Sequence, residues 1–509
     1  MIKFLLPGLL LFTLYVKAQE PSDALRYSRI TNSSGTARTM ALGGALTGLG
    51  GDLSTAAINP AGIALFKTNE IIVSPGFNMS NPRAEYFGQS QQSHKESFNF
   101  GANGFVLSRL ISNGYHHKNI SGGFYVTKLA NFNNKISFRG VNSRSSYSEK
   151  YLEELVNNNV TDPNTASRDY PFGSSLAVNT YLVEPMLDAN GNATGYKSMS
   201  TPTTGVLQEQ VIETSGGITA VGFGLGANID DKFYYGGTFE VDVLKFKRKQ
   251  TFKESDPSNK FPNNFNYFTV DDLLETDGIG STFKLGVLYK PMEYLRIGLA
   301  LHTPMIVGMT DSFTTSITTD LENYRGQGTL TQSSLDLLGQ KGIYDYSFFS
   351  PWKILGGISY VIREVSDVSK QRGFLTAEIE YLDYGSAKFR DPYLKKDQYL
   401  NEVNKVTQSQ YKNVVNFRAG AELKFNIIMF RAGFGYFSNP YTDPAINGKR
   451  INISSGLGYR DKGFFVDLSY EHQLVNDGYY PYRLQDNYYA PVKISGWIGT
   501  VMLSAGVKF

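Results

Sequence analysis

Apolar and polar residues alternate over long stretches of this chain, and a period of two predicts β-strands with one apolar face. The last stretch shows the pattern clearly: Val501, Leu503, Ala505 and Val507 are separated mostly by small or polar residues, and the chain ends on Phe509. The same alternation recurs in residues 283–289, 295–302, 415–425, 430–436 and 464–471. Strands of about ten residues or more, with charges on the second face, are typical of a membrane barrel with a polar interior.

We expect about 14 such strands, joined by links that alternate between short and long. The expected strands lie near residues 70–82, 94–109, 118–140, 215–229, 232–250, 277–290, 294–311, 345–363, 371–389, 411–425, 427–438, 450–460, 463–473 and 494–509. The long polar links lie at about 141–213, 251–276, 312–344, 391–411 and 473–493. Short turns at one end and long loops at the other are the outer-membrane pattern. The sequence therefore predicts an all-β fold, a transmembrane antiparallel β-barrel over residues 67–509, with the long loops outside the cell.

Residues 1–18 have the features of a secretory signal peptide. Lys3 precedes an apolar run over residues 4–16, which is too short to span a membrane, and small residues precede Gln19. The formal charge is +3, and removal of Lys3 and Lys17 with this leader lowers it to about +1. A near-neutral chain gives no support for nucleic acid as a partner.

The composition excludes a helical membrane protein. After the leader no stretch approaches about 18 uninterrupted apolar residues, and the mean hydropathy is −0.26. A barrel escapes such a test, because its lipid-facing residues alternate with lumen-facing ones. The 33 Tyr suit membrane interfaces, and the absence of Cys excludes a lipid anchor and a disulfide framework. We expect the protein in the outer membrane of a Gram-negative bacterium.

Residues 19–66 are unlike the strands, because they are rich in Gly, Ala, Ser and Thr. Small residues let backbones pack closely, which suits a plug inside a barrel wall. Pro60 fixes its own φ and biases Asn59 towards an extended conformation, so we expect a corner there where the plug meets the wall. A flexible periplasmic arm is the alternative that the composition leaves open.

This segment resembles the start of the FadL-like outer-membrane transporters of hydrophobic compounds, in the branch found in Bacteroidetes. The features that carry the resemblance are the small-residue runs 41–45 and 52–57, Asn59-Pro60-Ala61, the strand pattern and the terminal Phe509, and residues 23–40 are similar to the Bacteroidetes branch. It implies that residues 19–66 form a hatch that blocks the lumen, with gating residues Gly43, Gly44, Asn59, Pro60 and Ala61. It also implies diffusive transport from a loop site to a lumen site, then sideways through the wall at a kink in the third strand. Phe509 resembles the assembly signal that the barrel-assembly machinery recognises.

The third expected strand contains Asn131, Phe132, Asn133 and Asn134, which break its alternation. Asn tolerates unusual backbone angles, so a bulge is predicted here, and we assign these residues to the lateral-exit kink. A turn that splits one strand into two is the alternative.

Eight charged residues share the phase opposite to the apolar stripe and are expected to face the lumen: Lys284, Arg296, Glu378, Glu380, Arg418, Glu422, Arg431 and Asp467. Their opposite signs allow the pairing that buried charges need. Acid–base chemistry is the competing interpretation, but no nucleophile–base pattern accompanies them. The five His residues have no metal-site spacing. We therefore expect no enzyme activity, no metal and no cofactor.

Two functions from different classes remain open. The first is a channel for hydrophobic small molecules such as long-chain fatty acids, which needs an apolar cavity reaching from the loops to the wall. The second is a PorV-like barrel subunit of a secretion or assembly complex, which needs a filled lumen and an exposed apolar loop surface. Outer-membrane lipids and a hydrophobic ligand are the expected partners, and the sequence identifies neither the ligand nor a protein partner. The insertion at about 141–213 departs from the family, whose groove-forming segments lie in later loops.

Overall fold

The computed structural model describes residues 19–31, 35–111, 117–258, 263–362, 372–393, 395, 397–485, 487 and 490–509. The expected signal peptide, residues 1–18, lies outside this part of the chain. Within the described residues, no helix is long and apolar enough to cross a membrane.

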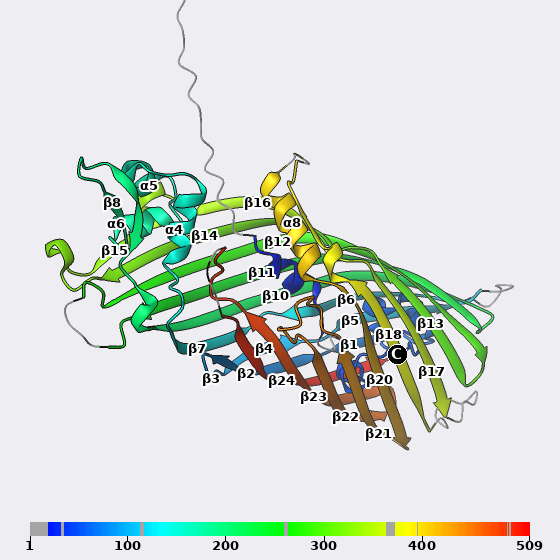
Figure 1. The fold of residues 1–509 in the computed structure, drawn as a ribbon. Coiled ribbons are helices and arrows are strands. Elements are labelled where there is room, and N and C mark those ends of the chain that lie inside the picture. The colour runs from blue at the N-terminus through cyan, green and yellow to red at the C-terminus, as the bar shows by residue number, and fades with distance from the viewer. Residues whose placement is uncertain are drawn as a thin grey trace, which may run out of the picture.

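Antiparallel strands close into a ring, which Figure 1 shows from the side. The ring closes because β1 (Glu70–Val73) and β2 (Pro75–Tyr86) both pair with the last strand, β24 (Val492–Lys508). Fourteen spans make up the ring, since several spans are split into two strands. The prediction of an all-β antiparallel barrel of about 14 strands is confirmed.

The other split spans are β4 (Lys95–Phe100) with β5 (Asn103–Leu110), β6 (His117–Asn131) with β7 (Asn134–Asn142), β13 (Leu295–His302) with β14 (Ile306–Asp320), β16 (Gly342–Phe349) with β17 (Lys353–Ile362), and β18 (Gly373–Asp383) with β19 (Lys388–Arg390). The continuous spans are β10 (Val206–Ile229), β11 (Phe233–Ser255), β12 (Tyr267–Met292), β20 (Asn413–Phe425), β21 (Ile428–Phe437), β22 (Arg450–Asp461) and β23 (Phe464–Tyr479). Two short strands, β3 (Gln89–Gln92) and β15 (Leu330–Ser333), extend the pairing of β2 and β14.

Tight turns join the strands at one end of the barrel, which we call the turn end. Phe425 pairs with Ile428 and Asp461 pairs with Phe464, so each of these two loops has two residues. In the second loop Lys462 and Gly463 have φ values of 46° and 88°. Successive positive φ angles give the hairpin turn whose twist matches that of the strands.

Longer connections lie at the opposite end, which we call the loop end. The link between β7 and β10 contains α4 (Glu149–Asn157), α5 (Pro163–Arg168), α6 (Ser174–Asn179), the hairpin of β8 (Val183–Leu187) and β9 (Ala193–Ser198), and η2 (Pro202–Thr204). Figure 1 shows these helices gathered beside the far ends of the long strands. The other loop elements among the described residues are η3 (Tyr324–Gly326), α7 (Ser334–Leu338), η5 (Tyr384–Ser386) and α8 (Gln398–Gln410).

The strands run further towards the loop end than their alternation predicts. β11 and β12 pair as far as Ser255 and Tyr267, so their loop spans 256–266 instead of about 251–276. The outer face of this extension is charged: Lys247 lies 2.8 Å from Glu275 there. Backbone pairing continues where the hydrophobic period disappears, because ladder hydrogen bonds do not require apolar side chains.

The outer face nearer the turn end is apolar. On β24, Val501, Leu503 and Val507 are all exposed, and their neighbours in sequence point inwards. Phe509 lies just beyond the strand, is 62% exposed, and exchanges two backbone hydrogen bonds of 3.1 Å with Asn69. A contiguous exposed apolar band of this kind is the surface that a bilayer covers.

Candidate functional site

The expected hatch, residues 19–66, is called the hatch segment below, and its described residues 19–31 and 35–66 are mostly buried and contact strands of the ring. It contains α1 (Pro21–Ser28), α2 (Ala37–Ala41), α3 (Thr55–Ile58) and η1 (Pro60–Leu65). The backbone N–H groups of Ala37 and Thr47 donate to Ser504 on β24 and Glu378 on β18, at 2.7 and 3.0 Å. On another side of the ring, the η1 residue Ala61 is fully buried against Leu288 of β12.

The two adjacent glycines of the hatch segment have positive φ angles, 64° at Gly43 and 80° at Gly44. A Cβ on Gly43 would lie 2.8 Å from the backbone oxygen of Phe434 on β21. Close backbone approach therefore requires glycine at Gly43. Gly44 also lines the cavity described below.

The side chain of Asn59 forms hydrogen bonds both within the hatch segment and with the barrel wall. Its Nδ2 donates to the carbonyl oxygens of Thr47 (2.7 Å) and of Val287 on β12 (3.1 Å), and its Oδ1 accepts from Ala61 N–H (3.2 Å). Pro60 then begins η1, where its missing N–H costs no helix hydrogen bond.

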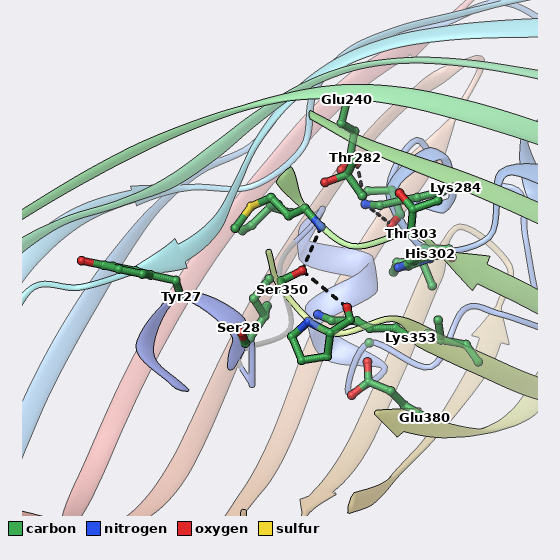
Figure 2. A pocket seen from close by; sticks show the side chains of 18 of the residues that line it. Tyr27, Ser28, Glu240, Thr282, Lys284, His302, Thr303, Ser350, Lys353 and Glu380 are labelled. Carbon is green, nitrogen blue, oxygen red and sulfur yellow. Dashed lines mark hydrogen bonds and ion pairs between the residues drawn. The ribbon is translucent and has the colours of Figure 1, made fainter. Parts of the chain in front are cut away.

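A cavity of about 110 Å³ lies between the hatch segment and the wall (Figure 2). One side of it is charged. Lys284 Nζ lies 2.6 Å from Glu240, and Arg418 lies 2.5 Å from Glu378 and 3.3 Å from Glu380. β11 and β12 therefore supply one ion pair, and β18 and β20 supply a second group of paired charges.

Lys353 also lines this cavity, and Figure 2 shows it on the same side as Glu380. Among the described residues, its ammonium group forms no hydrogen bond or ion pair. Glu380 instead bonds Arg418 and, at 2.7 Å, the amide of Asn416. A ligand with an acidic end would find an available cation here.

The other side of the cavity is apolar. Its lining there consists of Tyr27, Ile30, Leu129 and Met305. Tyr27 also belongs to a larger cluster of buried hydrophobic residues. Phe132 packs on that cluster, with its ring centroid 6.1 Å from that of Tyr27. Apolar side chains therefore run without interruption from the cavity to the end of β6.

The wall is interrupted beside Phe132. β6 ends at Asn131 and β7 begins at Asn134, and both pair with β10. On the other side, the β5–β6 ladder reaches Asn103 opposite Val126. Beyond it β4 pairs with β2, and in the described residues no backbone ladder joins β4 to β6 or β7.

Side chains bridge this interruption in place of a ladder. Asn131 Nδ2 donates to Ser97 Oγ at 3.3 Å, and Ser80 Oγ donates to Asn134 Oδ1 at 2.8 Å. Lys95 Nζ reaches across to the carbonyl oxygen of Thr214 on β10, at 3.1 Å. Individual polar contacts are easier to separate than a continuous backbone ladder. The boundary between β4 and the β6–β7 span is therefore weaker than the neighbouring strand pairs.

The eight charged residues expected in the lumen fall into separate groups. Lys284, Glu378, Glu380 and Arg418 line the cavity. Away from the cavity lining, Arg431 lies 2.6 Å from both Glu422 and Asp467, and Arg38 of the hatch segment joins them at 3.4 Å from Glu422. Arg296 contacts the hatch segment, where it donates to the carbonyl oxygen of Leu49 at 3.0 Å.

Sequence reasoning missed Glu240, Lys353 and the apolar lining. Glu240 lies between the outward Phe239 and Val241, so the alternation used elsewhere would have found it. His302 is at the cavity too, where its Nε2 lies 2.7 Å from the carbonyl oxygen of Ile58. No group of three or more metal-ligating side chains occurs among the described residues.

Known proteins share this fold. The crystal structure of a Pseudomonas aeruginosa FadL homologue superposes with a TM-score of 0.52 at 15% identity, covering 94% of this chain and 99% of that one. The P. putida toluene transporter TodX gives a TM-score of 0.50 at 12% identity, with the same coverage. No protein-family model and no curated protein matches the sequence. At these identities the comparison establishes that the chain has the barrel fold of these two proteins.

Proposed function

We propose that this protein is a channel of the Gram-negative outer membrane for the diffusive uptake of hydrophobic small molecules, such as long-chain fatty acids. The observation that carries the proposal is the apolar path from the cavity past Leu129 to Phe132 at the interrupted wall. The fold shared with a toluene transporter and a FadL homologue supports it.

The energetics favour such a path over a water-filled pore. Each CH₂ group that leaves water gains about 0.8 kcal/mol, so an acyl chain follows apolar surfaces. In our proposal the ligand passes from the loop end into the cavity and leaves sideways between β4 and the β6–β7 break. The contacts of Asn131 with Ser97 and of Asn134 with Ser80 separate to let it through.

In this proposal the cavity has two sides that orient an amphiphilic ligand, one apolar and one charged. Its apolar side takes the tail, and Lys353 takes an acidic end, since the other cations of the lining are paired. The hatch segment closes the remaining lumen, so that the barrel does not leak ions while the ligand moves through it.

The alternative of an assembly subunit receives less support. It requires a filled lumen, whereas a cavity of about 110 Å³ remains between hatch and wall. We therefore favour the channel, and contacts with outer-membrane lipids and the barrel-assembly machinery belong to the same proposal.

Uptake of labelled oleate by cells that lack their own importer tests the proposed function. Expression of the chain should raise uptake, and Leu129→Gln should lower it severalfold by placing an amide in the apolar path. Leu25→Gln is the matched control, because Leu25 is equally buried but belongs to a different cluster. Uptake that stays at the level of cells without the protein would contradict the proposal.

A further inference from the structure

Two prolines face each other in neighbouring strands of the barrel wall. His302 is opposite Lys353, and Ile306 is opposite Phe349. The same register sets Pro304 opposite Pro351 in the link between these pairs. Because proline has no N–H, neither strand donates a ladder hydrogen bond at this position.

Two hydroxyl groups replace the missing donors. Thr303 Oγ1 accepts from Phe283 N–H at 3.0 Å and donates to the carbonyl oxygen of Pro304 at 3.3 Å. Ser350 Oγ accepts from Met305 N–H at 2.8 Å and donates to the carbonyl oxygen of Pro351 at 3.4 Å. Figure 2 shows the two contacts of Ser350 as dashed lines.

This proline seam, residues 303–305 with 350–352, separates the cavity from the outer face of the barrel. Thr303, Met305, Ser350 and Pro351 line the cavity on the inside. On the outside, Trp352 is 53% exposed. Only one layer of the wall, weakened at the two prolines, lies between the cavity and the surface that faces the bilayer.

We propose that the proline seam is a second opening in the wall, used by uncharged apolar molecules. This inference rests on the proposed function, and it adds a route distinct from the β6–β7 break. Separating the strands here breaks one backbone hydrogen bond, from Ser350 N–H to the carbonyl oxygen of Met305 at 3.0 Å, and the bond from Met305 N–H to Ser350 Oγ. The Ser350 hydroxyl keeps its bond to Pro351, and the contact of Thr303 with Phe283 on β12 lies on the other side of the span and is not broken.

The two routes differ in the charge that they accept. The proline seam itself carries no charged side chain. A carboxylate that entered it would lose its contact with Lys353, and its charge would be desolvated at a cost in free energy. At the β6–β7 break, the ammonium group of Lys95 lies beside the proposed path and can form an ion pair with a passing carboxylate. We therefore assign neutral hydrocarbons to the seam and acidic amphiphiles to the break.

The test compares toluene and oleate uptake in the full-length protein. The double variant Pro304→Val and Pro351→Val restores two N–H donors, so it should lower toluene uptake severalfold and leave oleate uptake unchanged. The matched control is Ile297→Val with Ile358→Val, which changes a directly opposite, outward pair on the same spans. This control should transport both compounds normally.

A reversible disulfide distinguishes a direct effect on transport from an indirect effect of misfolding. The chain contains no Cys, so Ile306→Cys with Phe349→Cys places one thiol pair on opposite strands beside the seam. Oxidation should lower toluene uptake and reduction should restore it in the same folded protein. Unchanged toluene uptake on oxidation, or an equal loss for oleate, would overturn the second route while the proposed function stands. A wild-type protein that transports neither compound would overturn the proposed function and this inference with it.

Discussion

Lys284 on β12 and Glu240 on β11 form an ion pair of 2.6 Å at the point where the hatch segment meets the wall. The two residues are 5% and 0% exposed, and Lys284 also donates to the carbonyl oxygen of Ala57 in α3, at 2.8 Å. One ammonium group thus joins two wall strands to the hatch.

Replacement of this lysine should be costly. Lys284→Met leaves the carboxylate of Glu240 buried without its cation, and we expect the free energy of unfolding to fall by about 3–5 kcal/mol. Adding Glu240→Gln should recover part of the loss, because the uncompensated charge is removed. Urea titrations of the two variants in detergent check this, and equal stability of Lys284→Met and the wild type would contradict the ion pair's role.

Removal of the hatch should open the lumen. Deleting residues 23–57 removes α2, most of α1 and α3, and the contacts of Thr47 and Ala37 with the wall. We expect ion conductance across a planar bilayer from the deleted protein and none from the full chain. If the deleted protein stays non-conducting, something else fills the lumen, and the assembly-subunit alternative gains support.

The break between β6 and β7 should control the passage of acids. Phe132→Val with Asn133→Thr favours regular strand pairing, because both new residues are β-branched. We expect oleate uptake to fall severalfold while the barrel still shows heat-modifiable mobility. Asn158→Thr, an exposed change after α4, is a control that should alter neither property. Normal oleate uptake through a straightened strand would rule out lateral exit at this position.

The strands were predictable, whereas the cavity was not. Period-two alternation distinguishes Phe417 from Arg418 without any tertiary information, because one side of the wall faces outwards. The apolar lining depends on how Tyr27 of the hatch and Met305 of β13–β14 meet, which no local pattern contains. The opposition of Pro304 and Pro351 is likewise a property of register between segments far apart in the sequence.

Thiol labelling checks the alternation directly. We expect Arg418→Cys to react with a water-soluble reagent and Phe417→Cys to react with a lipid-soluble one, because Phe417 is exposed on the outer face and Arg418 binds Glu378 inside. Reversed reactivity would mean that β20 has the opposite orientation in the membrane.

The last strand combines the two requirements of membrane insertion, an apolar outer face and a paired C-terminus. Leu503 lies on the outer face, 44% exposed, and Phe509 holds the strand end by its two backbone hydrogen bonds with Asn69. Leu503→Lys should cost up to about 2–4 kcal/mol if the residue lies near the bilayer midplane, because an ammonium group would enter hydrocarbon. Deletion of Phe509 should slow assembly further, since Asn69, the residue before β1, loses its backbone partner where the ring closes. The matched control is Val156→Lys, which places the same charge at a residue of α4 that is 68% exposed and lies in the long link between β7 and β10.

Refolding into lipid vesicles, followed by an assay of heat-modifiable mobility, should show a folding defect for Leu503→Lys and for the Phe509 deletion, and normal folding for the control. Normal folding of the combined Leu503→Lys and Phe509-deleted variant would show that this strand does not face lipid.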